Sequence, residues 1–507
     1  METLSKDALL VAPRQKLIDA IQTQQSEITQ LLSRLAEVEF HLEWFKRQMF
    51  GVKSERFISD DDAQTMLDLG VIETSDIPAQ TQKISYERRT SQSKSEKPGH
   101  GRSTMPTHLP FVDTIIEPRG DLSGLKRIGE EMTWYYDMKP GSLVIRRIIR
   151  PKYASPDGEG ILIGELPALP IDKGNAGAGL MTQVVIDKYV YHLPLDRQRK
   201  RFKSEYDVDF AESWLCDIVR KTGFWISGVY KASIDRLMKC SYLQADETPI
   251  PVLTRDHKGK THRGYFWVYH DPLERLVVFD YRESRSSKGP GDFLKNFKGV
   301  LQVDGYDGYD PIASRGDIVR AACMDHVRRR FEQALDYDKE KASYVLEEMK
   351  KWYDVEKQAK QEGLSVEQRF SLRLEKTVPS MNAFGAWLSE QLPRILPKSP
   401  LGAAITYALN QWPHFKSFMT DQRIELSNIL IENAIRPIAI GRKNYMFIGS
   451  HEAAKCAAMI YSLVATAKSH EIDPFVYIND LLTRLPNASN LDTDQFLIPV
   501  WKPQDTK

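Results

Sequence analysis

The chain has 507 residues, and its 70 lysines and arginines nearly balance its 69 aspartates and glutamates. A net charge of +1 excludes a strong global attraction to nucleic acid, so DNA binding would depend on local basic patches. No stretch approaches the ~18 apolar residues of a membrane span, and the N-terminus lacks the apolar core of a signal peptide, so we expect a cytoplasmic protein without a membrane partner. Four cysteines without a close pair indicate neither disulfides nor a zinc knuckle.

The N-terminal region has the periodicity of a coiled coil. Within residues 13–52, apolar side chains recur every seven residues at Ile21, Ile28, Leu35, Leu42 and Met49, with a second apolar seam between them. Spacings that alternate between three and four predict a coiled coil and hence a homo-oligomer, with an intramolecular helix as the alternative. Residues 53–105, rich in serine and lysine, predict a flexible linker.

Two further segments precede the acidic motifs. Residues 106–170 contain alternating aromatic and β-branched positions, which predict a small strand-rich domain. Residues 171–238 predict helices and include the basic run DRQRKRFK. Its side chains are candidates for DNA phosphate contact, with a solvated basic face as the alternative: Arg197, Arg199, Lys200, Arg201 and Lys203.

The first two of three notable acids follow apolar runs. SYLQADETPIPVL predicts a buried strand that delivers Asp246 at its C-terminal end, and THRGYFWVYH and RLVVFDYRES predict two more strands joined by a turn at Asp271 and Pro272. PGDFLKNFKG predicts a short amphipathic helix. GVLQVDGYDGY then predicts a strand that stops at Asp304, next to a glycine turn.

The third acid is Glu432, in SNILIENAIRP. This segment predicts a short helix capped by Ser427 that ends or kinks near Pro437. Glu432 lies 128 residues after Asp304, and the intervening residues 331–420 are rich in Glu, Lys, Gln and Leu, which predicts a helical insertion. We expect residues 239–450 to form one α/β core around this insertion and residues 451–507 to form a C-terminal helical segment.

Three carboxylates delivered by strands and a helix suit a divalent metal site. Magnesium prefers hard oxygen ligands, and two such ions roughly 4 Å apart support an in-line displacement at phosphorus. Each acid also has a structural alternative. Asp246 could cap a turn before Pro249, Asp304 could be an Asp-Gly turn residue, and Glu432 could pair with Arg436 across one helical turn.

Polar and basic residues around the last two acids are also candidates for contact with the DNA substrate. A structural role is the alternative for His326, which could equally be a satisfied core histidine. The candidates are His326, Arg328, Arg329, Arg436, Arg442, Lys443 and Asn444.

In these motifs the chain resembles the IS66-type insertion-sequence transposases, members of the DDE superfamily with an RNase H-like catalytic core. The matching words are QADETPIPVL, LQVDGYDGY, CMDHVRRRF, ENAIRPIAIGRKNYMFIGS and, near the N-terminus, FKRQMFGVKSERF. The resemblance implies that Asp246, Asp304 and Glu432 are the catalytic and metal-binding acids of a DNA transposase that uses Mg²⁺ or Mn²⁺, with two ions expected. It also implies terminal-repeat and target DNA as partners, together with small accessory proteins of the same element.

The chain departs from this family pattern after the linker. Relatives usually carry two CxxC pairs there, whereas this chain has Pro118, Asp121, Ser155 and Gly158. These side chains cannot form a thiolate site, so we expect a zinc-finger-like domain without zinc. Two alternatives to a transposase stay open. The loss of the cysteine pairs favours a non-catalytic or domesticated DNA-binding protein, and an RNase H-like nuclease that only hydrolyses would use the same metal site as a transposase.

Overall fold

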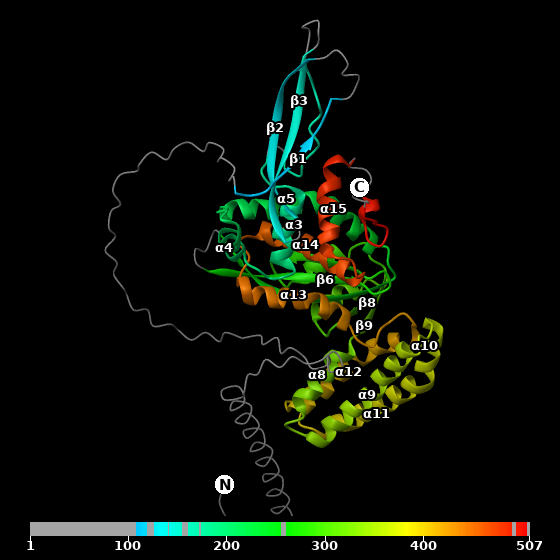
Figure 1. Cartoon of the computed structure of the whole chain (residues 1–507). Helices are drawn as coiled ribbons and strands as arrows, with labels where there is room; N and C mark the ends of the chain where they lie inside the picture. The colour runs from blue at the N-terminus through cyan, green and yellow to red at the C-terminus, as the bar shows by residue number, and fades with distance from the viewer. Residues whose placement is uncertain are drawn as a thin grey trace, which may run out of the picture.

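The computed structural model describes residues 108–118, 126–139, 141–154, 161–171, 174–254, 260–488 and 493–503. The predicted coiled coil of residues 13–52 and linker of residues 53–105 lie outside these ranges, as do Asp121, Ser155 and Gly158. Within them, no helix is long and apolar enough to cross a membrane. The described part is elongated, with a blade of strands at one end, a sheet covered by helices in the middle and a helical lobe at the other end (Figure 1).

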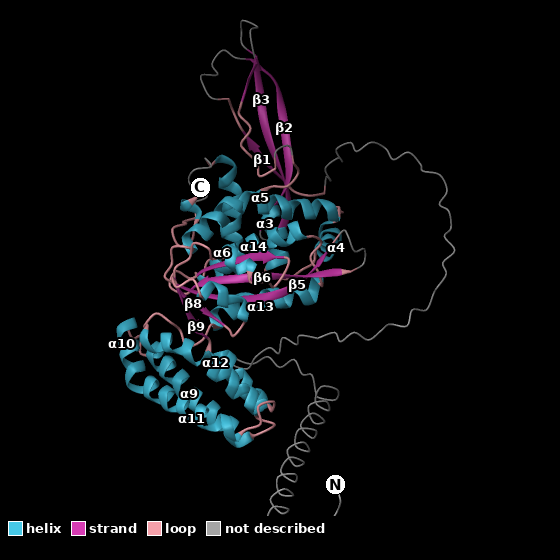
Figure 2. Cartoon of the chain, turned by 180° about the vertical axis from the view of Figure 1, so that it is seen from behind, coloured by secondary structure: helices cyan, strands magenta, loops and turns pink. Residues whose placement is uncertain are grey.

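The blade is a four-stranded sheet built around one long hairpin. Its strands are β1 (Phe111–Ile115), β2 (Lys126–Lys139), β3 (Ser142–Ala154) and β4 (Ile161–Ile163). β2 and β3 pair antiparallel, β1 joins β3 in parallel, and β4 pairs with the end of β3. The strands expected here are therefore present, and the hairpin projects from the body of the molecule (Figure 2). The zinc-finger-like assignment stays a prediction.

Helices from both halves of the chain cover one side of the central sheet. They are α3 (Ala178–Tyr189), α4 (Leu195–Tyr206), α5 (Glu212–Leu237), α14 (His451–Ser469) and α15 (Pro474–Arg484). α14 packs on both α5 and β7, and α15 packs on α3. The helices expected within residues 171–238 and after residue 450 are present, and segments far apart in sequence share one apolar core.

The central sheet has five strands in the order β7-β6-β5-β8-β9. They are β5 (Tyr242–Leu253), β6 (Thr261–Asp271), β7 (Leu276–Arg282), β8 (Gly299–Val303) and β9 (Ile318–Ala322). β5, β6 and β7 form the expected antiparallel meander, and β8 and β9 add to β5 in parallel. The short helix before β8 is α6 (Lys288–Phe293), which ends earlier than its sequence suggests.

The chain then leaves the sheet to form the helical lobe. Its helices are α8 (Met324–Ala334), α9 (Lys339–Gln361), α10 (Val366–Leu372), α11 (Val378–Gln391) and α12 (Pro400–Thr420). The lobe has an apolar core of its own, in which Trp352, Phe384 and Phe415 are almost fully buried. Most charged residues of this stretch lie on the outer faces of packed helices, and Arg373 is a buried exception.

The chain returns to the sheet through α13 (Ile429–Tyr445), which corrects two expectations. The helix runs through Pro437 instead of ending there, because the missing N–H of a proline removes one backbone hydrogen bond while the buried Ile431, Ile435 and Ile438 hold both halves on the core. Its N-cap is Asn428 without a side-chain cap bond; Ser427, one residue earlier, accepts from the Ile429 amide at 3.0 Å.

Gly299 at the start of β8 offers a test of the sheet. Its φ is +137°, and an added Cβ would lie 2.4 Å from the Ser241 carbonyl oxygen. Gly299→Ala should lower the free energy of unfolding by about 2–4 kcal/mol, because strain and backbone overlap add. Gly291→Ala, where nothing lies within 4 Å of the added Cβ, should change it by under about 1 kcal/mol. Urea denaturation measures both, and equal effects would contradict the argument.

Candidate active site

The parallel pairing of β5 with β8 brings the first two acids together. Gln244 lies opposite Gln302, and the same register continued by two residues places Asp246 beside Asp304. Neighbours in register point to the same face of a sheet, so both carboxylates emerge on one face. Asp246 lies in the middle of β5 and not at its end, which corrects the expectation. β6 pairs with β5 from Gln244 to Leu253, while the ladder with β8 stops at Gln244, two residues before the acid.

Asp304 sits where β8 ends and a tight turn begins. Its carboxylate accepts a hydrogen bond from the Tyr306 amide at 3.0 Å, so Asp304 has the structural role in a turn that was the alternative, and its catalytic role stays a prediction. The Gly305 amide donates to the Tyr407 hydroxyl of α12 at 3.1 Å, and a Cβ on Gly305 would lie 2.6 Å from the Tyr407 ring. Glycine is therefore required where the helical lobe touches this turn.

Glu432 lies in the first turn of α13, which packs across β5 and β6. Its carboxylate pairs with Arg329 of α8, whose nitrogen lies 3.2 Å and 3.3 Å from the two carboxylate oxygens. The partner of Glu432 is thus a residue 103 positions earlier in the chain and not Arg436 of its own helix, which overturns the simple helix-pair alternative.

The three acids share one electrostatic environment. The pKa of Asp246 is raised well above its usual value, first by burial and then by Glu247, Asp304 and Glu432. Negative charges this close together repel, which disfavours an ionised Asp246 in the absence of a cation. Asp246 does not cap a turn before Pro249, because the strand continues to Leu253.

Glu247 is a site residue that the sequence did not reveal. Its side chain is only 4% exposed and pairs with Arg285 at 2.6 Å. Burial first, and Asp304 next, raise the pKa of Glu247, while Arg285 lowers it. The Arg285 guanidinium also lies 4.2 Å from the centre of the Tyr306 ring. The adjacency of Asp246 and Glu247 was the only signal, because the partner is 38 residues away.

His326 in α8 lies within the influence of two of the acids. Burial lowers the pKa of its imidazole, while Asp304 and Glu432 act to raise it. Its Nδ1 is buried without a hydrogen-bond partner. An orphaned nitrogen beside carboxylates is costly unless something in the working site satisfies it.

A preformed metal site is absent from the part of the chain that the structure describes: no three His, Cys, Asp or Glu side chains there are grouped so as to hold a metal ion. The chemistry of the donors fits a hard cation, since Asp246 and Asp304 lie side by side and His326 Nδ1 lacks a partner. Glu432 faces Arg329, so it would have to leave this ion pair to become a third ligand.

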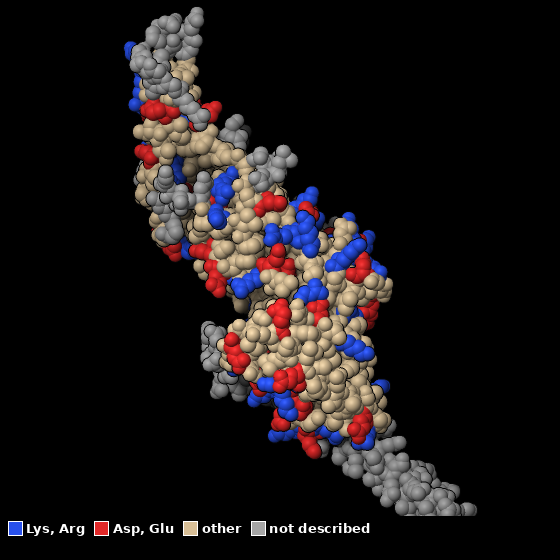
Figure 3. Space-filling model, turned by 90° about the vertical axis from the view of Figure 1, so that its right-hand side faces the viewer, with Lys and Arg blue, Asp and Glu red and all other residues tan. Residues whose placement is uncertain are grey.

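The basic run in α4 is largely neutralised by nearby acids. Lys200 pairs with Asp196 at 2.7 Å, and Lys203 pairs with Asp207 at 2.6 Å. Arg199 contacts Asp196 and Asp209, and Arg201 contacts Asp187 and Glu205. Arg197 is exposed. Figure 3 likewise shows basic and acidic side chains intermingled on the visible face. A role of this run in DNA binding therefore rests mainly on Arg197.

Several of the remaining candidates for DNA contact also have partners within the protein. Arg442 anchors α13 to β5 by donating to the Pro249 carbonyl at 2.6 Å, and Asn444 donates to the Ile440 carbonyl of its own helix. Arg328 pairs with Glu332 at 3.1 Å. Lys443 is exposed and Arg436 is half-buried on α13. Arg442 and Asn444 thus have structural roles that their sequence context did not indicate.

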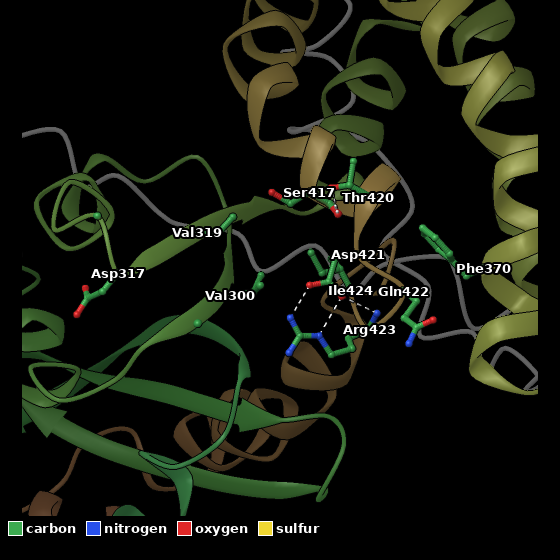
Figure 4. Close-up of a pocket in the computed structure, with 12 residues that line it drawn as sticks. Val300, Asp317, Val319, Phe370, Ser417, Thr420, Asp421, Gln422, Arg423 and Ile424 are labelled. Atoms are coloured by element: carbon green, nitrogen blue, oxygen red, sulfur yellow. Dashed lines mark hydrogen bonds and ion pairs between the residues drawn. The ribbon is translucent and has the colours of Figure 1, made fainter.

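A separate hollow of about 640 Å³ lies where the helical lobe meets the sheet. Figure 4 shows it between Val300 and Val319 of the sheet and Thr420 to Ile424, with Phe370 on the lobe side. None of the three acids lines it. Its lining residues lie at the junction between the helical lobe and the sheet.

Comparison with known proteins identifies the class. Residues 173–456, more than half of the chain and including all three acids, match the family model described as "Transposase IS66 family", and residues 462–499 match "IS66 C-terminal element". Residues 37–113 match "Transposase C of IS166 homeodomain". The chain belongs to the IS66 family of transposases. Membership implies a DNA-processing enzyme and a DNA partner.

The similar curated proteins come from Sinorhizobium fredii (strain NBRC 101917 / NGR234). Uncharacterized protein y4jD is 29% identical over 498 residues, covering 94% of this chain and 96% of that protein. Uncharacterized protein y4hP is 26% identical over 503 residues, covering 92% and 89%. The similarity therefore extends over nearly the full length of both proteins.

The raised pKa of Asp246 predicts a stability cost at the site. A carboxyl whose folded pKa is raised contributes stability below its unfolded pKa, near 3.8, and loses that contribution as pH rises through the folded pKa. Asp246→Asn should therefore raise the free energy of unfolding by about 2 kcal/mol at pH 8 in EDTA, and by less at pH 4. Urea denaturation at the two pH values measures this. Asp217→Asn, at an exposed position of α5, is the control. No gain in stability for Asp246→Asn would contradict the prediction.

The ion pairs of α4 give a second test. Arg201 contacts the Asp187 carboxylate, which is 3% exposed, so Arg201→Ala should cost about 2 kcal/mol of stability. Arg197→Ala should leave the free energy of unfolding within about 0.5 kcal/mol of wild type. Loss of a phosphate contact should weaken DNA binding and also reduce its salt dependence. Thermal unfolding and binding titrations at two salt concentrations separate the roles. A loss of DNA affinity only in Arg201→Ala, with no loss of stability, would reverse the assignment.

Proposed function

We propose that this chain is a DNA transposase that cleaves the ends of an insertion element and joins the freed 3′ hydroxyls to target DNA. Asp246, Asp304 and Glu432 are its catalytic acids. The observation that carries the proposal is the register of β5 and β8, which sets the two aspartates side by side in a chain of the IS66 transposase family. The pKa of Asp246 is raised first by burial and then by Glu247, Asp304 and Glu432, and the contribution of Glu432 supports the inclusion of the third acid.

The core that carries these acids is proposed to be RNase H-like. The strand order β7-β6-β5-β8-β9 supports this, with an antiparallel meander followed by two parallel strands. Asp246 lies on the first strand of the meander and Asp304 after the first parallel strand. In this proposal the core covers residues 239–450, and the helices of residues 331–420 are an insertion between its last strand and its last acid.

The proposed cofactor is Mg²⁺ or Mn²⁺, held by the carboxylates of Asp246 and Asp304, with Glu432 as a further ligand. When bound, such ions activate the attacking oxygen and stabilise the leaving 3′ oxygen at phosphorus. The protein's own groups prepare this site. Burial disfavours the charged form of Asp246, so a bound cation would stabilise it. Arg329 pairs with Glu432, and its guanidinium would also contact a DNA phosphate.

DNA contacts are proposed for two exposed basic side chains that form no ion pair with the other described residues. These are Arg197 on α4 and Lys443 on α13. Arg329 and His326 lie beside the acids and would meet the scissile phosphate group. Self-association through residues 13–52 and help from small accessory proteins remain proposals that follow from the sequence.

Replacing any single acid tests the function. Asp246→Ala, Asp304→Ala and Glu432→Ala should each lower strand transfer by at least about 10³-fold, because each removes a ligand or charge from the transition state. DNA affinity should change by less than about threefold. The assay uses element ends, target DNA and Mg²⁺, and it scores cleaved and joined products separately.

Glu347→Ala, on the exposed face of α9, provides the matched control and should keep wild-type activity. Full activity in all three acid variants would disprove the assignment. Cleavage without joining in the wild-type protein would favour a nuclease that only hydrolyses, and DNA binding without either product would favour a non-catalytic DNA-binding protein.

A further inference from the structure

Two buried glutamines lie one pleat behind the two aspartates. Gln244 precedes Asp246 by two residues on β5, and Gln302 precedes Asp304 by two residues on β8. The glutamines face each other in the parallel register, and neither side chain has any exposed surface. Side chains two residues apart on a strand share a face, so the glutamines lie on the same face as the acids, toward the interior of the protein.

Gln302 uses its full hydrogen-bonding capacity. Its amide nitrogen donates to the Ala322 carbonyl at 2.9 Å and to the Glu425 carbonyl at 2.8 Å. Its amide oxygen accepts from the Tyr242 hydroxyl at 2.5 Å and from the Gln244 amide at 2.9 Å. With two donors and two acceptor positions occupied, the side chain has one allowed orientation.

Gln244 and Tyr242 extend this network to the same segment of chain. The Gln244 amide donates to the Ser427 carbonyl at 3.3 Å, and the Tyr242 hydroxyl accepts from the Glu425 amide at 3.1 Å. His270 Nδ1 lies 3.3 Å from the Gln244 amide oxygen, and Nδ1 is the donor because an amide oxygen can only accept. Burial lowers the pKa of this histidine to about 4, so the ring is neutral at physiological pH. The network thus binds residues 425–427 to strands β5 and β8.

The helical lobe holds the same segment from the opposite side. Arg373, which is fully buried, donates to the Ile424 carbonyl at 2.8 Å, and Arg369 donates to the Glu425 carboxylate at 2.8 Å. The Met324 amide donates to the Leu426 carbonyl at 3.0 Å. Figure 4 shows the preceding residues Asp421 to Ile424 passing close to Val300 of β8. Segment 424–428, which leads directly into α13, is therefore fixed between sheet and lobe.

We propose that Gln244 and Gln302 are positioning residues that set the place of Glu432 relative to Asp246 and Asp304. Glu432 follows the clamped segment by only four residues, within the first turn of α13. Each aspartate follows one of the glutamines by two residues. The hydrogen bonds of the glutamines to residues 425–427 therefore fix the position of Glu432 relative to both aspartates. The proposal rests on the proposed catalytic function of these acids, which it refines.

The polar character of the network supports positioning over simple stability. Apolar side chains would fill the same space at lower cost, since buried amides add stability only when every bond is made. Apolar contacts, however, tolerate sliding, whereas hydrogen bonds to named backbone groups fix one register. A segment that starts at Ile424, 102 residues after β9 ends at Ala322 (424 − 322), needs such a register.

Gln302→Met in the full chain tests the proposal, because methionine keeps the length of the side chain and removes four hydrogen bonds. Amide hydrogen exchange across residues 424–432 should become at least tenfold faster. Strand transfer should show a kcat at least tenfold lower, with the KM for element ends within twofold of wild type. The concentration of Mg²⁺ that gives half-maximal activity should rise.

Gln198→Met is the matched control. Gln198 is also fully buried, and it donates to the Val184 and Leu193 carbonyls at 3.1 Å and 3.0 Å between α3 and α4. It should lower Tm by an amount similar to Gln302→Met, with kcat within twofold of wild type and unchanged exchange in residues 424–432. Equal loss of kcat in both variants would reduce Gln302 to a stability role and overturn the proposal.

Tyr242→Phe is the milder second variant if Gln302→Met does not fold, since it removes only the hydroxyl that accepts from the Glu425 amide. Unchanged exchange of residues 424–432 in the folded variants would overturn the clamp. If the wild-type protein lacks strand transfer but exchange of residues 424–432 is faster in the variants, the clamp is supported and the proposed function is overturned.

Discussion

The parallel register between β5 and β8 is the constraint on which the candidate site depends. It aligns Gln244 with Gln302, and two residues later it places Asp246 beside Asp304. A shift by one residue would turn one acid to the opposite face of the sheet. Gly299 begins β8 in a backbone conformation that suits glycine, and β9 fixes the other edge of β8. The position of the acids is thus a consequence of backbone pairing.

Grouping carboxylates in a half-buried place costs stability, and the structure offsets that cost with basic side chains. Arg329 pairs with Glu432 and Arg285 pairs with Glu247. No basic side chain among the described residues pairs with Asp246, and burial and the neighbouring acids raise its pKa well above its usual value. Of these three acids, Asp246 would therefore be stabilised most by a bound cation. Such local conflict is typical of functional sites, because a core selected for stability alone would not retain it.

The helical lobe acts on the site through the chain that returns from it. Residues 424–428 are held by Arg369 and Arg373 on the lobe side and by the buried glutamines on the sheet side. Tyr407 of α12 also contacts the turn after Asp304. The insertion between the second and third acids is therefore physically joined to both, and movement of the lobe would displace Glu432 relative to the aspartates.

The sequence by itself determined the meander of β5 to β7, the strand before Asp304, the helices of the insertion and the three acids as candidates, because apolar periodicity and turn residues act locally. It misplaced Asp246 at a strand end and left open whether α13 ends or kinks near Pro437. Cross-strand pairing extends β5 past the acid, and burial of Ile431 to Ile438 continues α13 through the proline. Only the tertiary structure decided the partners: Arg329 for Glu432, Arg285 for Glu247, Asp187 for Arg201 and the glutamine pair for residues 425–427. These contacts join residues 14 to 183 positions apart, and such distances leave no periodic trace in the chain.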